Sequence, residues 1–173
     1  MSITTYAELQ SAVGDWLNRD DLSPVVTSFI SLAEARINRD LRHRQQETRS
    51  SLTIGARYVD LPADWLETIR IQIDGNTKYN LELVSHADMA DMRDRNADAT
   101  GQPGFYSFAA GQIEVFPTPS ETYTGEILYF AKVPALSDSN TTNWLLTAHP
   151  DIYLYGSLVH TAPYLADDGR TQV

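Results

Sequence analysis

The spacing of hydrophobic residues divides the chain into three parts. Between about residues 6 and 42 the apolar positions recur every three or four residues, as in amphipathic helices. Between about residues 50 and 133 they recur every second residue, as in half-buried strands. From residue 150 the period is helical again, with apolar residues on several sides. The pattern predicts the α+β class, in which terminal helices form a small bundle and an antiparallel β region is inserted between them.

Two N-terminal helices are expected from their start signals. Thr5 and Glu8 have the spacing of a capping box, so the first helix is expected from about Tyr6 to Leu17. Ser23 followed by Pro24 indicates the start of the second helix, because proline suits the first helical turn. The residues expected to bury one face of the second helix are Phe29, Ala33, Ile37 and Leu41, with Val26 and Ile30 beside them.

The central region is expected to contain about six strands. Asp74-Gly75 is a strong hairpin signal and leads into a strand expected over residues 79–83. Leu61 to Glu67 are expected to form a turn, because proline cannot donate a hydrogen bond to a strand ladder. Ser85 to Arg95 are expected to form a small exposed helix, capped by Ser85 and Asp88.

A polar loop over residues 137–143 precedes a last helix, which is expected from Pro150 to Leu165. Because this helix is apolar on several sides, we expect it to be central and well covered. Pro163 is expected to kink or end it. The expected domains are an N-terminal helical part (residues 1–48), an inserted antiparallel β subdomain with a small helix (residues 49–136) and a C-terminal helix that packs on the N-terminal helices (residues 137–173).

Composition narrows the class of protein. The 173 residues are 42% hydrophobic, which is enough for a core, and they include no cysteine. Disulfides and thiolate metal sites are therefore excluded. The N-terminal residues lack a signal-peptide pattern, and no stretch approaches the roughly 20 apolar residues of a membrane span. We expect synthesis in a reducing cytosol and no membrane partner.

Charge is unevenly distributed along the chain. The net charge is −10, yet six of the thirteen basic residues lie between Arg36 and Arg57, where only Asp40 and Glu47 are acidic. An acidic chain lacks the basic footprint that DNA phosphates require, so sequence-specific DNA recognition is not expected.

The arginine-rich segment allows two interpretations. It is either a solvated helix end, where cations complement the helix dipole, or a surface that docks an acidic partner through guanidinium–carboxylate pairs. Arg36, Arg39 and Arg42 follow a three-residue step, so they are expected to gather near the end of the second helix. The candidate interface residues are Arg36, Arg39, Arg42 and Arg44.

No group of residues indicates catalysis. The chain lacks a phosphate-binding glycine loop and a Gly-x-Ser-x-Gly elbow. Its four histidines lack metal-binding spacing, and His86 with Asp88 is more simply a solvated helix start. Asp60 with Asp64 is more simply a pair of exposed acids in a turn than an acid and base. The sequence therefore predicts no enzyme activity, no catalytic residue, no cofactor and no metal site.

Aromatic residues on the expected strands leave a second class of function open. Such residues usually pack in a core, but they also form stacking platforms for sugars or single-stranded nucleic acid. The residues concerned are Tyr106, Phe108, Tyr123, Tyr129 and Phe130.

Short motifs follow one another in a recognisable order along nearly the whole chain. In the N-terminal part they are Tyr6, Leu9, Trp16 to Arg19, Asp21, Leu22, Phe29, Leu32 to Arg39, Leu41 and Arg42. Further along they are Leu61-Pro62 with Asp64 and Leu66, Gly101 to Pro103, Trp144 to Leu146, Pro150 to Gly156, Ala162 to Leu165 and Asp167-Asp168. Together they resemble the head-to-tail adaptor, or connector, proteins of short-tailed bacteriophages, which are related to the tail tubular protein A group.

The resemblance implies a structural virion protein of the neck, made in the host cytoplasm. It would form a homo-oligomeric ring, commonly of twelve copies, between the portal protein and the tail nozzle protein. The helical part would face the portal, and the β part would contribute to the tail-side surface. Genomic DNA would pass through the ring during ejection without specific binding.

Two hypotheses about surfaces follow, together with two alternative functions. Acids of the small helix or the β loops would face the channel, since they repel DNA phosphates. The arginine-rich segment would meet a neighbouring copy or the portal. The first alternative is a carbohydrate-binding or glycan-degrading tail component with an aromatic-lined groove. The second is an interaction domain of unrelated origin.

Overall fold

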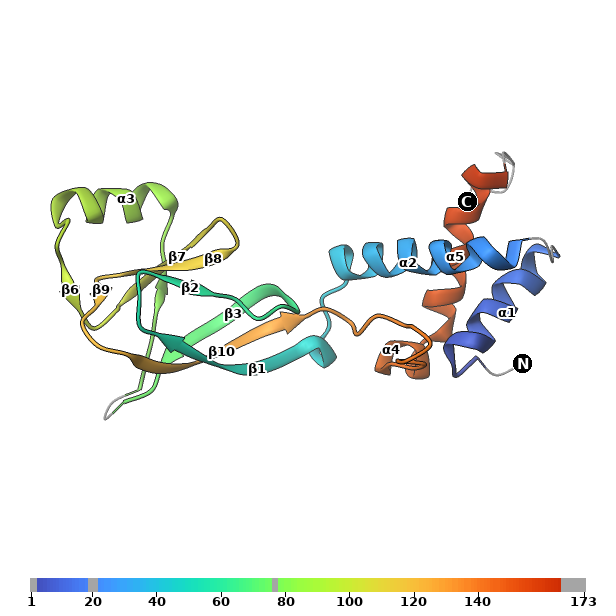
Figure 1. Cartoon of the computed structure of the whole chain (residues 1–173), viewed down its shortest axis with the longest axis horizontal. Helices are drawn as coiled ribbons and strands as arrows, with labels where there is room; N and C mark the ends of the chain where they lie inside the picture. Colours follow the sequence, from blue (N-terminus) through green and yellow to red (C-terminus); the bar gives the residue numbers. More distant parts are fainter. Residues whose placement is uncertain (1–2, 19–21, 76–77, 166–173) are drawn as a thin grey trace. The chain divides into compact units, whose positions relative to one another are not determined.

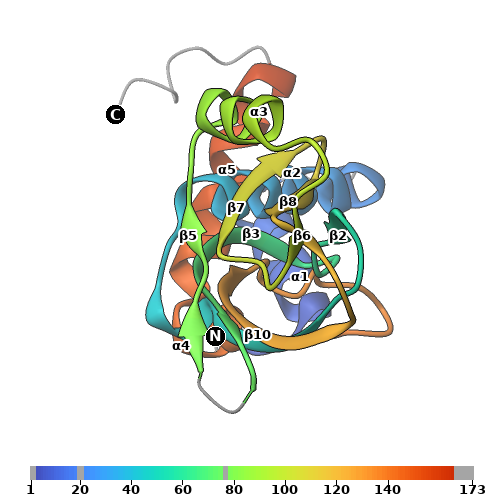
Figure 2. The same cartoon turned by 90° about the vertical axis from the view of Figure 1, so that its left-hand side faces the viewer.

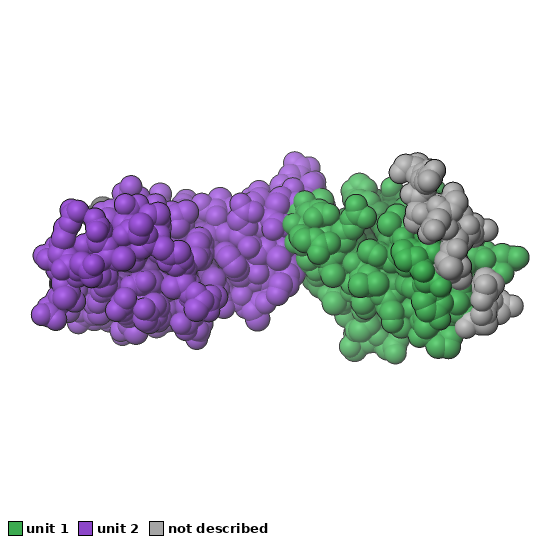
Figure 3. All heavy atoms as spheres, turned by 90° about the horizontal axis from the view of Figure 1, so that it is seen from above, with its two compact units in different colours: residues 1–41, 133–173 green, residues 42–132 purple. Residues whose placement is uncertain are grey.

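The chain divides into two compact units (Figure 1; Figure 3). The computed structural model describes residues 3–18, 22–75 and 78–165. The helical unit comprises residues 1–41 and 133–173, and the β unit comprises residues 42–132. The expected combination of helices and antiparallel strands is confirmed.

The N-terminal helices begin where the sequence predicts. The helices of the helical unit are α1 (Tyr6–Leu17), α2 (Ser23–Asp40), α4 (Trp144–Ala148) and α5 (Pro150–Leu165). Thr5 Oγ1 accepts a hydrogen bond from the Glu8 amide (3.3 Å), and Glu8 Oε2 accepts one from the Thr5 amide (2.9 Å). These bonds form the expected capping box. Pro24 lies in the first turn of α2, as expected.

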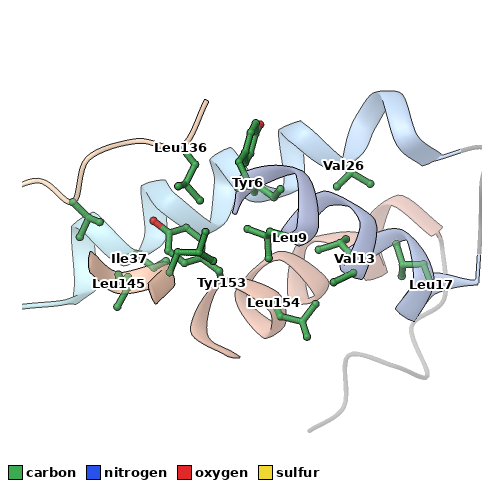
Figure 4. Close-up of a cluster of buried hydrophobic side chains, with 14 of the residues drawn as sticks. Tyr6, Leu9, Val13, Leu17, Val26, Ile37, Leu136, Leu145, Tyr153 and Leu154 are labelled. Carbon is green, nitrogen blue, oxygen red and sulfur yellow. The ribbon is translucent and has the colours of Figure 1, made fainter. Parts of the chain in front are cut away.

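The core of the helical unit lies between these helices, and Figure 4 shows its side chains converging from them. Among its members are Leu9, Val13, Val26, Ile30, Ile37, Leu145, Leu146, Tyr153 and Leu154. Full burial of such a side chain contributes about 1.5–3 kcal/mol. Helices α2 and α5 pack closely, because a Cβ on Gly156 would lie 3.4 Å from that of Ala33.

The C-terminal helices differ from expectation in three ways. Helix α4 was not expected, and Asn143 caps it by accepting a hydrogen bond from the Leu146 amide (2.8 Å). Pro163 does not end α5, since the helix continues to Leu165. Nor is α5 covered on all sides. Its exposed apolar residues are Ile152, Tyr155, Val159 and Tyr164.

The β unit contains, within its described residues, two four-stranded sheets and one two-stranded sheet. The strands are β1 (Glu47–Ile54), β2 (Tyr58–Asp60), β3 (Trp65–Ile73), β4 (Tyr79–Asn80), β5 (Glu82–Leu83), β6 (Thr100–Gly101), β7 (Phe105–Ala109), β8 (Gln112–Phe116), β9 (Thr118–Pro119) and β10 (Tyr123–Ala131). The unit also contains η2, a 3-10 turn (Arg44–Gln46), and α3 (His86–Arg95). The described residues thus form ten strands, more than the about six expected, and four of the ten are only two residues long.

The strand order is β1-β10-β3-β4 in one large sheet and β2-β8-β7-β5 in the other. The expected hairpin at Asp74-Gly75 is confirmed, since Ile73 of β3 lies opposite Tyr79 of β4 in an antiparallel pair. The two sheets share one hydrophobic core. It includes Leu52, Ile54, Val59, Ile71, Ile73, Tyr106, Ile113, Val115, Ile127 and Tyr129.

Three expectations for the β unit are wrong. The strand expected over residues 79–83 is split, because the chain passes from one sheet at β4 to the other at β5. The pairs β5–β7 and β6–β9 are parallel, and Figure 2 shows β5 beside β7. Strand β3 begins at Trp65, inside the segment expected to be a turn.

Helix α3 packs on β7 and β8 and begins at the expected cap. Ser85 Oγ accepts a hydrogen bond from the Asp88 amide (3.1 Å) and donates one to Asp88 Oδ2 (2.6 Å). Met89 and Arg93 are buried. The helix is therefore not exposed all round, which corrects the expectation from sequence.

A pair of glycine substitutions is expected to act in opposite directions. A Cβ on Gly125 of β10 would lie 2.6 Å from the Gln72 carbonyl oxygen of β3, so Gly125→Ala must push two paired strands apart. We expect it to lower the free energy of unfolding by about 1–3 kcal/mol. Gly14→Ala, inside α1 with open space around its Cβ, should raise it by about 0.5–1 kcal/mol. Denaturation followed by circular dichroism measures the stability of both variants. Equal stabilities of Gly125→Ala and Gly14→Ala would contradict the close approach of β10 to β3 at Gly125.

Candidate functional site

Arg36 and Arg39 lie near the C-terminal end of α2. Their Nε atoms are 3.5 and 3.6 Å from the Asp40 carboxylate. The two arginine side chains are 54% and 71% exposed, so these ion pairs contribute little to stability. Both guanidinium groups are accessible to a partner.

Arg42 and Arg44 belong to the β unit. Helix α2 ends at Asp40 and Leu41 is extended, so the expectation that Arg42 continues the helical row is wrong. Arg42 Nε donates to Glu67 Oε2 of β3 (3.0 Å), and Arg44 is exposed in η2. The structure thus brings Arg36 and Arg39 together on one helix and assigns the other two arginines to a different unit.

A surface pocket of about 280 Å³ lies between α2 and α5. It is lined by Ala33, Arg36, Ile37, Asp40, Leu41, Ile152 and Gly156. Most of these side chains are apolar, and the charged ones, Arg36 and Asp40, belong to the exposed ion pair of α2. A pocket of this composition suits an apolar side chain better than a polar metabolite.

Helix α5 presents an apolar face to solvent. Ile152, Tyr155 and Val159 are spaced three and four residues apart, so they share one side of the helix. Trp16 of α1 extends this face, since it is 58% exposed and its ring meets Tyr155 edge-on with centroids 5.5 Å apart. Contiguous exposed apolar surface of this kind indicates a protein contact.

The apolar residues on several sides of α5 predict a helix covered by the rest of the chain, but the structure leaves one of its faces exposed. A helix that is hydrophobic all round must be covered, but the cover can also come from another chain. The signal for the exposed face was therefore present, and its interpretation was wrong.

Polar side chains of α2 hold the segment that follows β10. Asn38 Oδ1 accepts a hydrogen bond from the Val133 amide (2.9 Å), and Glu34 Oε1 accepts one from the Leu136 amide (2.8 Å). Burial raises the pKa of Glu34 above its ordinary value, against the effect of the Leu136 amide. These bonds fix the segment to the helical unit and have a structural role.

A second polar cluster lies inside the β unit. Glu114 Oε1 accepts hydrogen bonds from Nε of Arg93 (3.0 Å) and Nε of Arg57 (2.8 Å). Arg93 also donates to Thr118 Oγ1 (2.8 Å) and stacks on the Phe116 ring. Because Arg93 comes from α3 and Glu114 from β8, the cluster fastens the helix to the sheet.

The carboxylates considered as a catalytic pair have separate structural partners. Asp60 Oδ1 accepts a hydrogen bond from Gln112 Nε2 (2.7 Å), and Asp64 Oδ1 accepts one from the Tyr129 hydroxyl (2.9 Å). Burial, together with this bond, raises the pKa of Tyr129 to about 12. The two acids thus connect neighbouring parts of the β unit.

The aromatic residues of the strands are mainly core residues. Tyr106 and Tyr129 are buried, and the partly buried Phe108 packs against Tyr106 and Trp65 with ring centroids 5.7 and 5.3 Å apart. The interpretation as core packing is confirmed for Tyr106 and Tyr129.

Among the residues that the structure describes, no group of three or more potential ligands could hold a metal. No helix in the described ranges is long and apolar enough to cross a membrane.

Comparison with protein families gives one match over nearly the whole chain. The family described as SU10 adaptor protein matches residues 4–173, a range that includes segments of both units. No curated protein matches the chain. The family match is not confined to one short motif or to one of the two units. The chain therefore belongs to the SU10 adaptor protein family.

Proposed function

We propose that this chain is a structural protein of the bacteriophage virion, a head-to-tail adaptor that forms a ring between the portal protein and the tail nozzle protein. The family match over residues 4–173 carries the proposal. The protein is made in the host cytoplasm and becomes part of the virion neck.

The division into two units supports a role between two partners. The terminal helices act as a small bundle that faces the portal, and the β unit contributes to the tail-side surface. A ring subunit also needs two different patches for its neighbours, and the exposed apolar face of α5 supplies part of this surface. We expect twelve copies in the ring.

Charge supports a channel through which DNA passes without binding. The chain carries a net charge of −10, and exposed acids gather on α3 and just after it. These acids are Asp88, Asp91, Asp94 and Asp98. A channel lined by such residues repels phosphates and lets the genome slide.

The arginines keep their proposed role at an interface, with a ranking among them. Arg36 and Arg39 are the stronger candidates, because exposed pairs with Asp40 exchange readily for a partner's carboxylates. Arg42 already bonds Glu67 and Arg44 belongs to the β unit, so we assign them a secondary role. The glycan-binding alternative loses support because Tyr106 and Tyr129 are buried and cannot stack on a sugar.

Sedimentation with the portal ring of the same virus tests the function. The purified chain is run alone, with the portal ring and with the portal ring plus nozzle protein. We expect it to move with the portal at a fixed ratio of about one copy per portal subunit, and to recruit the nozzle protein only in that complex. Failure of the chain to move with the portal at any ratio would contradict the proposal.

A further inference from the structure

Two chemically different patches lie on the two sides of the exposed face of α5. On the α1 side, Trp16 stands beside Tyr155, and the neighbouring Asp15 is exposed. On the α2 side, the pocket has an apolar lining that includes Ala33 and Ile152. One side therefore offers a protruding aromatic ring with an acid, and the other offers an apolar recess whose lining also includes the ion pair of Arg36 and Asp40.

The recess has the properties of a site for an aromatic side chain. Its lining is mostly apolar, and Gly156 adds no side chain that would fill it. Arg36 also lines it, and a guanidinium group is attracted to the face of an indole ring. Tryptophan and arginine are the residue types that most often dominate the energy of a protein interface.

We propose that Trp16 of one copy inserts into the α2–α5 pocket of the neighbouring copy, where Asp15 pairs with Arg36. The contact rests on the proposed function, since it supplies the subunit contact of the ring. Because Trp16 and the pocket are different patches of each chain, each copy can give its Trp16 to one neighbour and its pocket to the other, and such a head-to-tail contact generates a ring when the rotation closes. The second copy covers the apolar face that a single copy leaves exposed.

Arg36 is available to a second carboxylate. The Nε atom of Arg36 is 3.5 Å from Asp40, and both side chains are more than half exposed, so this pair is weak. When a tryptophan closes the pocket, water is displaced, so the guanidinium group attracts more strongly both Asp40 and a carboxylate that the partner brings to the rim. Asp15 brings this carboxylate with Trp16, because the two residues are adjacent on α1.

The test compares assembly on the portal ring for four variants of the full chain. Trp16→Ala is expected to raise the concentration needed for half-maximal assembly at least about tenfold, as loss of an interface anchor does. Asp15→Arg and Arg36→Asp are each expected to raise it about threefold to tenfold. The double variant Asp15→Arg with Arg36→Asp restores the pair with its charges exchanged, and should assemble within about threefold of the unchanged chain.

Two control variants show whether an effect is specific to this contact. Tyr58→Ala removes an exposed aromatic ring from the β unit, and Asp138→Arg reverses an exposed acid of the helical unit that lies outside α1, α2 and α5. Both are expected to assemble like the unchanged chain. Thermal melting of each variant checks folding, and the charge variants keep the test valid if Trp16→Ala lowers stability.

The outcomes separate this inference from the function on which it rests. If the unchanged chain assembles on the portal and the Trp16 and single charge variants do so equally well, the contact is wrong and the function stands. If the double variant needs as high a concentration for half-maximal assembly as the more strongly impaired of the two single charge variants, the Asp15–Arg36 pairing is overturned. An unchanged chain that does not assemble at all contradicts the proposed function itself.

Discussion

Glu114→Gln is expected to lower the free energy of unfolding of the β unit by about 3–5 kcal/mol. Glu114 accepts hydrogen bonds from Arg93 (3.0 Å) and Arg57 (2.8 Å), and the side chains of Glu114 and Arg93 are only 9% and 10% exposed. Glutamine keeps the size of the side chain but leaves the buried guanidinium group of Arg93 without an opposite charge. Breaking a buried pair from one side is costly, because the remaining charge has lost its hydration and its partner.

The matched control for this substitution lies on α3, the helix that carries Arg93. Asp91→Asn breaks the ion pair between Asp91 and Arg95 (2.8 Å), whose side chains are both mostly exposed. The expected change is within about 0.5 kcal/mol. Urea denaturation followed by circular dichroism measures both variants. Similar stabilities for Glu114→Gln and Asp91→Asn would show that the buried cluster does not hold α3 on the sheet.

Tyr153→Ala should destabilise the helical unit by about 3–5 kcal/mol, because it empties a large space in the core. Tyr153 is fully buried among core side chains that include Ile37 and Leu145 (Figure 4). Its hydroxyl accepts a hydrogen bond from Asn143 Nδ2 (2.7 Å), and burial raises its pKa well above the ordinary value. Thermal denaturation of the purified variant measures the loss.

Two companion variants distinguish the contributions to stability. One compares the ring of Tyr153 with its hydroxyl, and the other compares a buried side chain with an exposed one. Tyr153→Phe keeps the ring and should cost about 1–3 kcal/mol, because it removes the hydrogen bonds of the hydroxyl with Asn143 and Glu34. Tyr155→Ala, two residues along the same helix, removes a ring that is mostly exposed and should cost about 1 kcal/mol or less. A loss for Tyr155→Ala as large as that for Tyr153→Ala would contradict the assignment of inner and outer faces to α5.

Local signals in the sequence were sufficient for the N-terminal helices. The capping box of Thr5 and Glu8 and the proline at position 24 each act within one turn, so the starts of α1 and α2 could be predicted. The hairpin at Asp74-Gly75 and the cap at Ser85 have the same local character. Such features depend on residues a few positions apart and not on the rest of the fold.

Features that depend on distant parts of the chain could not be predicted in the same way. The passage from β4 to β5 and the parallel pairing of β5 with β7 are decided by packing between two sheets. The pairing of Arg42 with Glu67 joins residues 25 positions apart, so the local spacing of arginines gave no sign of it. Helix α4 is five residues long, too short for a periodic pattern to be recognised.

The candidate site was only partly predictable for a related reason. The sequence indicated a cluster of arginines, and the structure keeps Arg36 and Arg39 together on α2. The exposed face of α5 is predicted to be buried, because a hydrophobic pattern indicates that the residues need cover. The pattern does not show whether the same chain or a partner provides that cover. The pocket between α2 and α5 requires the packing of two helices that are far apart in sequence, and so it was found only in the structure.

Electron cryomicroscopy of the chain mixed with the portal ring of its own virus shows directly whether the chain is a head-to-tail adaptor. We expect a closed ring of this chain stacked on the portal, with the helical unit against the portal and an open channel along the axis. We also expect contact between neighbouring helical units at α5. A portal ring without added density, or single copies bound at its side without a closed ring, would contradict the assignment as a head-to-tail adaptor.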